Sequence, residues 1–159
     1  MREHSKTEIE RKICVAISLL RKNDAFLLEK VAHERSITHK LAEYIQVQFP
    51  EYHVDCEYNL HGVETKTLPR ECNGENKEKV FPDIIIHLRG TDENLLVIEA
   101  KPHLNRDRCD QIKLKLFTAK SGKFRYKYGL AIGFSGLAKP DITWFANGSK
   151  YRKRDKLKK

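Results

Sequence analysis

The sequence has little of several features that would place it in a familiar class. No apolar run approaches the roughly 18–20 residues needed to cross a bilayer, and the first residues, MREHSKTEIERK, contain no apolar stretch of a secretory signal. We therefore expect a cytoplasmic protein with no membrane contact. The four cysteines are scattered singly, without a CxxC pair or histidines spaced as zinc ligands, so we expect reduced thiols.

Several catalytic motifs are also absent, namely a P-loop, GxGxxG, HExxH and a Ser-His-Asp pattern. What is present is a chain of 159 residues, 40% hydrophobic and 33% charged, which fits one globular domain. We expect that domain over residues 1–149 and a basic tail over 150–159. The net charge of +9 suggests a nucleic-acid partner. Because much of it lies in the tail, the tail either contacts a phosphate backbone or is a solvated end.

Residues 80–101 contain the most informative pattern. Two apolar runs, Ile84–Leu88 and Leu95–Ile98, are separated by a polar segment that includes Gly90. Runs rich in aliphatic and β-branched residues, joined by such a segment, predict an antiparallel β-hairpin. The start of one strand then lies beside the end of the other.

Charged residues occupy that end of the predicted hairpin. Asp83 opens the first strand, whereas Glu99 and Lys101 close the second and, being two residues apart, share a face. If the pairing sets Asp83 opposite either of them, two carboxylates and an ammonium group converge. The alternative for each residue alone is a solvated strand end with a surface ion pair worth about 0–1 kcal/mol.

Such a cluster has a chemical use. Carboxylates are hard oxygen ligands suited to Mg²⁺, which takes further oxygens from water and phosphate. A metal ion held there polarises a phosphoryl oxygen and lowers the pKa of a bound water. A neighbouring lysine can orient or deprotonate that water and offset charge that builds up on the phosphate.

The spacing resembles a known signature. Pro82-Asp83, fifteen residues and then Glu99-Ala100-Lys101 are similar to the PD-(D/E)xK motif of the restriction-endonuclease-like nucleases. The resemblance implies that Asp83, Glu99 and the backbone carbonyl of Ala100 bind Mg²⁺ (or Mn²⁺), and that Lys101 acts on the attacking water. The stretches 34–46 and 49–59 also resemble the N-terminal half of an uncharacterised bacterial branch of this superfamily.

The resemblance further implies a glutamate on an N-terminal core helix near the metal. Glu34, Thr38 and Leu41 follow helical spacing, so Glu34 can lie at the edge of a buried stripe and is the first candidate. Glu43 is the second, and a solvated helix glutamate is the alternative. His39 is a candidate for substrate contact, although a boundary polar residue is the more ordinary role.

A helix is also predicted after the Lys101 strand. Residues 105–107 offer an N-cap, and Cys109, Ile112, Leu116 and Ala119 form the expected buried stripe. In several families of this kind the helix faces the substrate, so Gln111 and Lys113 are candidates for phosphate contact. A solvated helix face is the competing interpretation of both residues.

The predicted element order is two helices, a strand, a hairpin, a helix and two strands, with a polar excursion over residues 60–79. A central mixed β-sheet flanked by α-helices would bury these elements, giving an α/β fold. The resemblance implies the restriction-endonuclease-like core. The predicted function is a Mg²⁺-dependent nuclease acting on DNA. The alternatives are a non-catalytic module that binds nucleic acid or protein, and a subunit that acts as a homodimer or with a partner.

Overall fold

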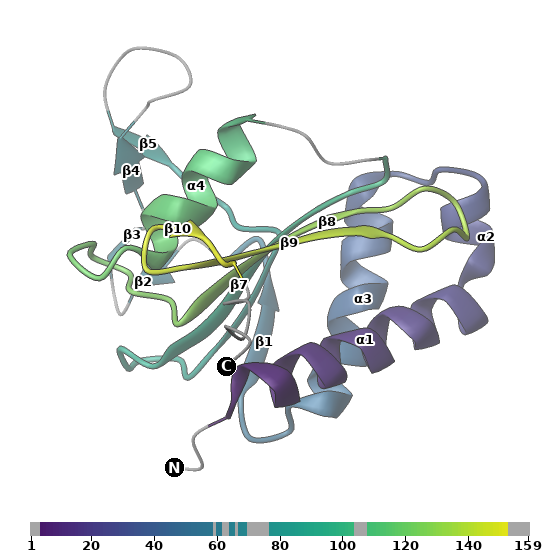
Figure 1. Ribbon diagram of the computed structural model, residues 1–159, viewed down its shortest axis with the longest axis horizontal. Helices are drawn as coiled ribbons and strands as arrows, with labels where there is room; N and C mark the ends of the chain where they lie inside the picture. Colours follow the sequence, from purple (N-terminus) through teal and green to yellow (C-terminus); the bar gives the residue numbers. More distant parts are fainter. Residues whose placement is uncertain are drawn as a thin grey trace, which may run out of the picture.

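The protein is built as three layers around one central sheet. The computed structural model describes residues 4–58, 60–61, 64–65, 67–69, 77–103 and 108–152, and for residues 60–79 the backbone alone. Three helices cover one face of the sheet and one helix covers the other (Figure 1). The helices are α1 (Lys6–Asn23), α2 (Ala25–Glu29), α3 (Glu34–Gln48) and α4 (Arg108–Thr118). The prediction of an α/β fold with a mixed sheet between helices is confirmed.

The main sheet has six strands in the order β1-β6-β7-β8-β9-β10. The strands are β1 (His53–Cys56), β6 (Ile84–His87), β7 (Asn94–Lys101), β8 (Tyr128–Gly133), β9 (Asp141–Ala146) and β10 (Ser149–Lys150). All neighbours pair antiparallel except β7 and β8, which are parallel. Parallel neighbours need a long crossover connection, and the segment that contains α4 supplies it.

Alternation along the two hairpin strands creates two separate cores. The even-numbered residues Ile84, Ile86, Leu96 and Ile98 pack with the buried faces of α1 and α3. The odd-numbered Ile85 and Val97 pack with Leu114 and Phe117 of α4. Because both faces of β6 and β7 are buried, their sequences are continuous apolar runs. This alternation places Val97, and two residues further on Glu99, on the α4 side of the sheet.

The first turns of α1 and α3 are capped by side chains. Ser5 caps α1, accepting a hydrogen bond from the Glu8 amide at 3.2 Å. The helices α2 and α3 are separate, broken between Glu29 and Glu34. At the start of α3 the His33 ring accepts a hydrogen bond from the Arg35 amide. An imidazole nitrogen accepts such a bond as a cap oxygen does.

The predicted stripe of α4 was one residue out of phase. Asp110, Leu114, Phe117 and Thr118 are the buried residues of this helix, whereas Cys109, Ile112 and Leu116 are half-buried. Aromatic Phe117 enters the core beside Phe124 and Tyr126, and its large apolar area outweighs the branched side chains at the expected positions. The rotation brings a carboxylate, Asp110, against the sheet.

Residues 60–79 are not simply without structure. Backbone pairing joins β2 (Leu60–His61) to β3 (Glu64–Thr65), and β4 (Thr67–Pro69) to β5 (Lys77–Lys79). A twenty-residue stretch without secondary structure is uncommon in a compact domain, and the short strands agree with that rule. The predicted cap at 105–107 and most of the basic tail, residues 153–159, lie outside the described part of the chain.

Two further expectations concern cysteine and membranes. Cys14 and Cys56 are free thiols, as predicted, and both are exposed. Cys109, in contrast, is disulfide-bonded, so the expectation of four reduced thiols is wrong for that residue. Among the residues described above, no helix combines the length and the apolar character needed to cross a bilayer.

Candidate functional site

The predicted site residues meet where β6 begins and β7 ends. Ile84 pairs with Ile98, and one further step of this register sets Asp83 opposite Glu99. The Ala100 amide donates a hydrogen bond to Asp83 Oδ2 at 2.7 Å, which fixes the aspartate against the end of β7. Glu99 follows Val97 on the odd-numbered face, so its side chain lies on the side covered by α4.

Glu99 is the most enclosed member of the group. Its residue is 2% exposed, and Oε1 has no hydrogen-bond partner among the residues that the structure describes. Burial, followed by repulsion from Asp83 and Asp110, raises the pKa of Glu99 well above its usual value. A buried carboxylate oxygen without a partner is costly, which makes this atom a candidate ligand for a cation.

Asp83 is also buried near other carboxylates, and its pKa is raised as well. Burial raises its pKa to about 6, against the opposing effects of the Ala100 amide and the Lys101 ammonium group. The two carboxylates therefore favour a proton or another cation between them at neutral pH. The fit to Mg²⁺ rests on these hard oxygen ligands, on the orphaned Glu99 oxygen and on the Ala100 carbonyl.

The Ala100 carbonyl follows from the strand geometry. In an antiparallel ladder the N–H and C=O of one residue point toward the same neighbouring strand. Since the Ala100 N–H points toward Asp83, its carbonyl is expected on the Asp83 side of β7 as well. Across the described ranges no three His, Cys, Asp or Glu side chains are arranged to hold a metal ion. A site here would be of the kind with two carboxylates and several waters, which is common for Mg²⁺.

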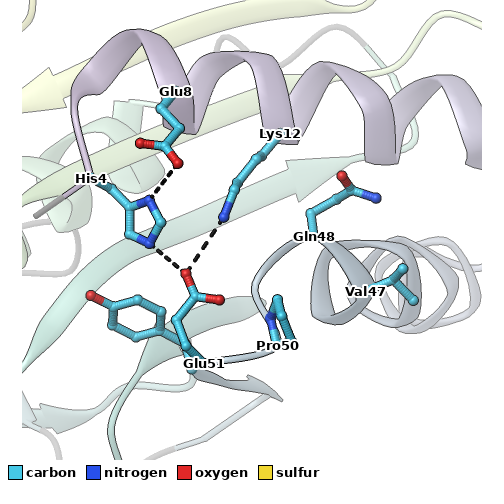
Figure 2. A pocket seen from close by; sticks show the side chains of 8 residues that line it. His4, Glu8, Lys12, Val47, Gln48, Pro50 and Glu51 are labelled. Carbon is cyan, nitrogen blue, oxygen red and sulfur yellow. Dashed lines mark hydrogen bonds and ion pairs between the residues drawn. The ribbon is translucent and has the colours of Figure 1, made fainter. Parts of the chain in front are cut away.

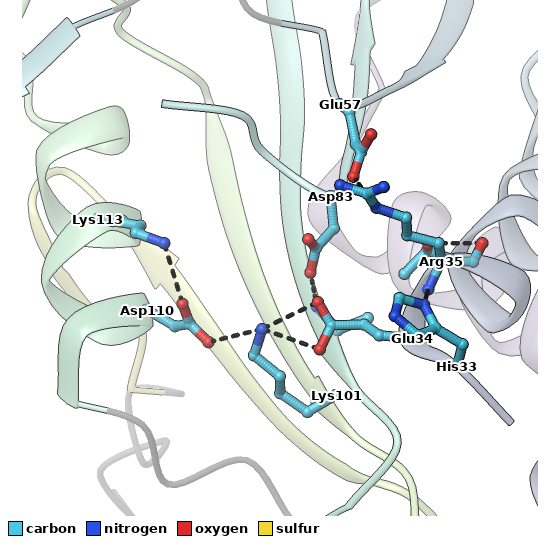
Figure 3. A network of polar contacts seen from close by, with 10 residues as sticks. His33, Glu34, Arg35, Glu57, Asp83, Lys101, Asp110 and Lys113 are labelled. Atoms are coloured by element: carbon cyan, nitrogen blue, oxygen red, sulfur yellow. Dashed lines mark hydrogen bonds and ion pairs between the residues drawn. The ribbon is translucent and has the colours of Figure 1, made fainter. Parts of the chain in front are cut away.

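Lys101 lies at one end of β7, where its side chain contacts residues of both α3 and α4. As the last residue of β7 it reaches Glu34 on α3, with its Nζ 3.1 Å from each carboxylate oxygen (Figure 3). On the other side its Nζ lies 3.6 Å from Asp110 Oδ2. Burial lowers the pKa of Lys101, but the attraction of Asp110, Asp83 and Glu34 outweighs it, so the net shift is upward. Lys101 is thus held as an ammonium group.

The helix start places Glu34 in this contact. Glu34 is the first residue of α3, where an acidic side chain interacts favourably with the unpaired amides and the helix dipole. Thr38 and Leu41 are buried one and two turns further on, and the Glu34 side chain is 33% exposed at the edge of their stripe. The contact joins two residues that are 67 positions apart.

Other predicted residues lie elsewhere or beside the site. Glu43, the second candidate for the helical acid, is exposed and forms ion pairs with Lys40 at 2.8 Å and with His39 at 3.0 Å. His39 therefore contacts a neighbour on its own helix. Gln111 is half-buried on α4, next to Asp110. Lys113 belongs to the network, with its Nζ 3.3 Å from Asp110 Oδ1.

Sequence reasoning did not single out Asp110. The residue is 3% exposed and touches both Lys101 and Lys113 (Figure 3). A signal was available, because Asp110, Leu114 and Phe117 recur at i, i+4 and i+7, which is the spacing of one helix face. An acid in line with two large apolar residues indicates a carboxylate turned inward.

Comparison with known proteins adds no second line of support. No protein-family model, curated protein or solved structure matches the chain. The assignment of the site therefore rests on its residues and their geometry.

A separate cavity of about 510 Å³ lies near the start of α1 and the end of α3 (Figure 2). It opens beside His4, Glu8, Lys12 and Glu51, which pair with one another: His4 Nδ1 is 3.1 Å from Glu8, and Lys12 Nζ is 3.5 Å from Glu51. Glu34 lies at the other end of α3, about 20 Å of helix away. The cavity is thus distinct from the cluster around Lys101.

Proposed function

We propose that the protein is a divalent-metal-dependent nuclease that hydrolyses phosphodiester bonds, with DNA as its substrate. The observation that carries the proposal is the meeting of Asp83, Glu99, Lys101 and Glu34 at the mouth of one hairpin. These residues come from three separate elements, so the cluster is not an accident of neighbouring positions.

In this proposal Asp83, Glu99 and the Ala100 carbonyl bind Mg²⁺ or Mn²⁺. The bound ion supplies Lewis-acid stabilisation of the phosphate and a water of lowered pKa. The buried Glu99 oxygen and the raised pKa values of both carboxylates support the assignment, because a divalent ion offsets the loss of solvation and the repulsion that these carboxylates experience.

Lys101 and Glu34 complete the proposed machinery. The sequence left open whether Lys101 orients the attacking water or deprotonates it. Its raised pKa favours the first role, because an ammonium group donates hydrogen bonds and offsets negative charge but does not accept a proton. Glu34 assists by accepting from the Lys101 ammonium group with both oxygens.

The restriction-endonuclease-like core is likewise a proposal. Its support is the topology in which an antiparallel hairpin, β6–β7, is followed by a helix and a strand parallel to β7. The net charge of +9 supports a polyanionic partner.

The first experiment replaces Asp83 or Lys101 by Ala. We expect either variant to lose cleavage of DNA that depends on Mg²⁺ or Mn²⁺, because one removes a metal ligand and the other the ammonium group beside it. Cleavage would be followed on gels with linear and circular DNA, with circular dichroism as a test of folding. Glu93→Ala is the matched control, because Glu93 is an exposed acid at the other end of the same hairpin. Undiminished cleavage by Asp83→Ala would remove the metal role.

A non-catalytic module that binds nucleic acid or protein is the second candidate. It is favoured by the lack, among the described side chains, of a third acidic or histidine ligand arranged around one ion. Calorimetric titration with Mg²⁺ or Mn²⁺ near neutral pH separates the two. Binding that disappears in Glu99→Gln supports the nuclease, whereas no binding by the native chain supports the module. Light scattering after size exclusion tests a homodimer in the same samples.

A further inference from the structure

Asp110 contacts two lysines at once. Its side chain is 4% exposed, and each of its carboxylate oxygens faces a different ammonium group. Oδ1 lies 3.3 Å from the Nζ of Lys113, and Oδ2 lies 3.6 Å from the Nζ of Lys101. A buried carboxylate is stable only when it is paired, and here both partners are cations of the candidate site or its rim.

The two lysines are mobile by nature but restrained here. A lysine ammonium group sits on a flexible four-carbon stem, so it does not keep one position without partners. Lys101 is held between Glu34 on α3 and Asp110 on α4 (Figure 3). Lys113 is held by Asp110 from one helical turn further along α4, and its side chain is 38% exposed. Two like charges thus share one buried counter-ion.

We propose that Asp110 is a positioning residue that sets the Lys101 and Lys113 ammonium groups as a pair facing one phosphate of a nucleic-acid substrate. The inference rests on the proposed function and deepens it. A phosphodiester presents two non-bridging oxygens, and cations placed in advance against them stabilise the charge that grows in the transition state. Asp110 itself touches neither the phosphate nor the metal.

The decisive variant is Asp110→Asn, which keeps the shape of the side chain and removes its charge. We expect kcat to fall about 100-fold, the loss typical of a misplaced catalytic group. The affinity for Mn²⁺, measured by calorimetry without nucleic acid, should stay unchanged. A loss of metal affinity of about tenfold or more would overturn the inference, because Asp110 would then support the metal itself. Asp110→Glu should recover part of kcat.

A second measurement does not depend on cleavage. Fluorescence anisotropy with a labelled DNA duplex in metal-free buffer reports binding alone, in the native chain, Asp110→Asn, Lys113→Met and the double variant. We expect both single changes to weaken binding, and the double variant to lose less affinity than the sum of the two single losses, because the part of the Asp110 effect that acts through Lys113 is already absent in Lys113→Met. Additive losses would overturn the inference, because Asp110 would then act independently of Lys113.

The two measurements separate this inference from the nuclease proposal. If the native chain cleaves DNA and Asp110→Asn cleaves it equally fast, the positioning role fails alone. If the native chain cleaves no nucleic acid, the nuclease proposal fails, and the binding cycle still decides whether Asp110 holds Lys113 for a phosphate. Lys113→Met leaves the buried carboxylate in place, so it tests the pair even if Asp110→Asn does not fold.

Discussion

At the scale of single residues, the buried carboxylates of the candidate site lower the stability of the metal-free protein. Asp83 and Glu99 are held where burial, followed by repulsion from neighbouring carboxylates, raises their pKa values, so the folded chain binds protons there more tightly than the unfolded chain. Sites that bind cations commonly have this property. The stability of the metal-free protein should therefore respond to pH in a defined direction.

Because the folded state binds more protons at these two acids, their contribution to the free energy of unfolding should fall as the pH rises from about 4 through 6. The shift at Asp83, from 3.8 to about 6, corresponds to roughly 2–3 kcal/mol. Urea unfolding at a series of pH values, with chelator present, measures the effect. Asp83→Asn should flatten the curve over this window. The same pH dependence in the native chain and in Asp83→Asn would contradict the assignment.

Glu99→Gln should raise the stability of the metal-free protein while it abolishes metal binding. The neutral isostere removes a buried charge that Asp83 and Asp110 repel. It also replaces a carboxylate whose Oε1 has no hydrogen-bond partner in the described part of the chain. We expect a higher melting temperature than that of the native chain without metal, together with loss of Mn²⁺ binding. Glu93→Gln, on the exposed hairpin turn, is the control and should change neither quantity. A lower melting temperature of Glu99→Gln would show that Glu99 has a stabilising partner.

At the scale of elements, the position of α4 decides whether Asp110 reaches the site. This helix packs closely on β8 because Gly129 has no side chain. A Cβ at Gly129 would lie 3.1 Å from Thr118 Cγ2, 3.3 Å from Leu114 Cδ2 and 3.3 Å from Phe145 Cβ. A side chain at this position would therefore force α4 away from the sheet.

Gly129→Ala should therefore destabilise the protein, by about 1–3 kcal/mol if the helix moves as overpacked cores do. Thr118→Ser offers a matched rescue, because it removes the nearest methyl group and keeps the hydroxyl that donates to the Leu114 carbonyl at 2.8 Å. The double variant should be more stable than Gly129→Ala in thermal or urea unfolding. Equal stability of Gly129→Ala and the double variant would show that the Thr118 methyl group is not the source of the strain.

Individual elements also show what the sequence alone could supply. The hairpin was predictable, because apolar runs and a polar turn are local signals, whereas the register that sets Asp83 opposite Glu99 came only from the structure. The phase of α4 was ambiguous, because the stripe from Cys109 and the stripe from Asp110 both follow helical spacing, and the packing of Phe117 with Phe124, outside the helix, decides between them. The cap of α3 was missed because histidine is an unusual N-cap. The choice of Glu34 as a site residue was reached through the family resemblance, and its contact with Lys101 was not predicted.

At the scale of the whole molecule, the basic residues at the end of the chain offer a test of the proposed nucleic-acid partner. Residues 153–159 contain five basic side chains and one acid. If they contact the phosphate backbone, their removal should reduce the slope of log K against log [salt], by up to about 4 for duplex DNA. Anisotropy titrations of Asp83→Ala, with and without these residues, measure the slope. An unchanged slope would show that the tail is only a solvated end.

The parallel contact between β7 and β8 has a consequence for a newly made chain. Residues Glu34 to Lys101 are made before β8, and one edge of β7 stays open until Gly133 has been added and β8 can pair with it. The α4 helix packs closely against Gly129 of β8, so Asp110 takes its place beside Lys101 only once β8 has joined the sheet. The candidate site can therefore assemble only after β8 has been synthesised and paired, and a nascent chain that stops short of Gly133 should lack it.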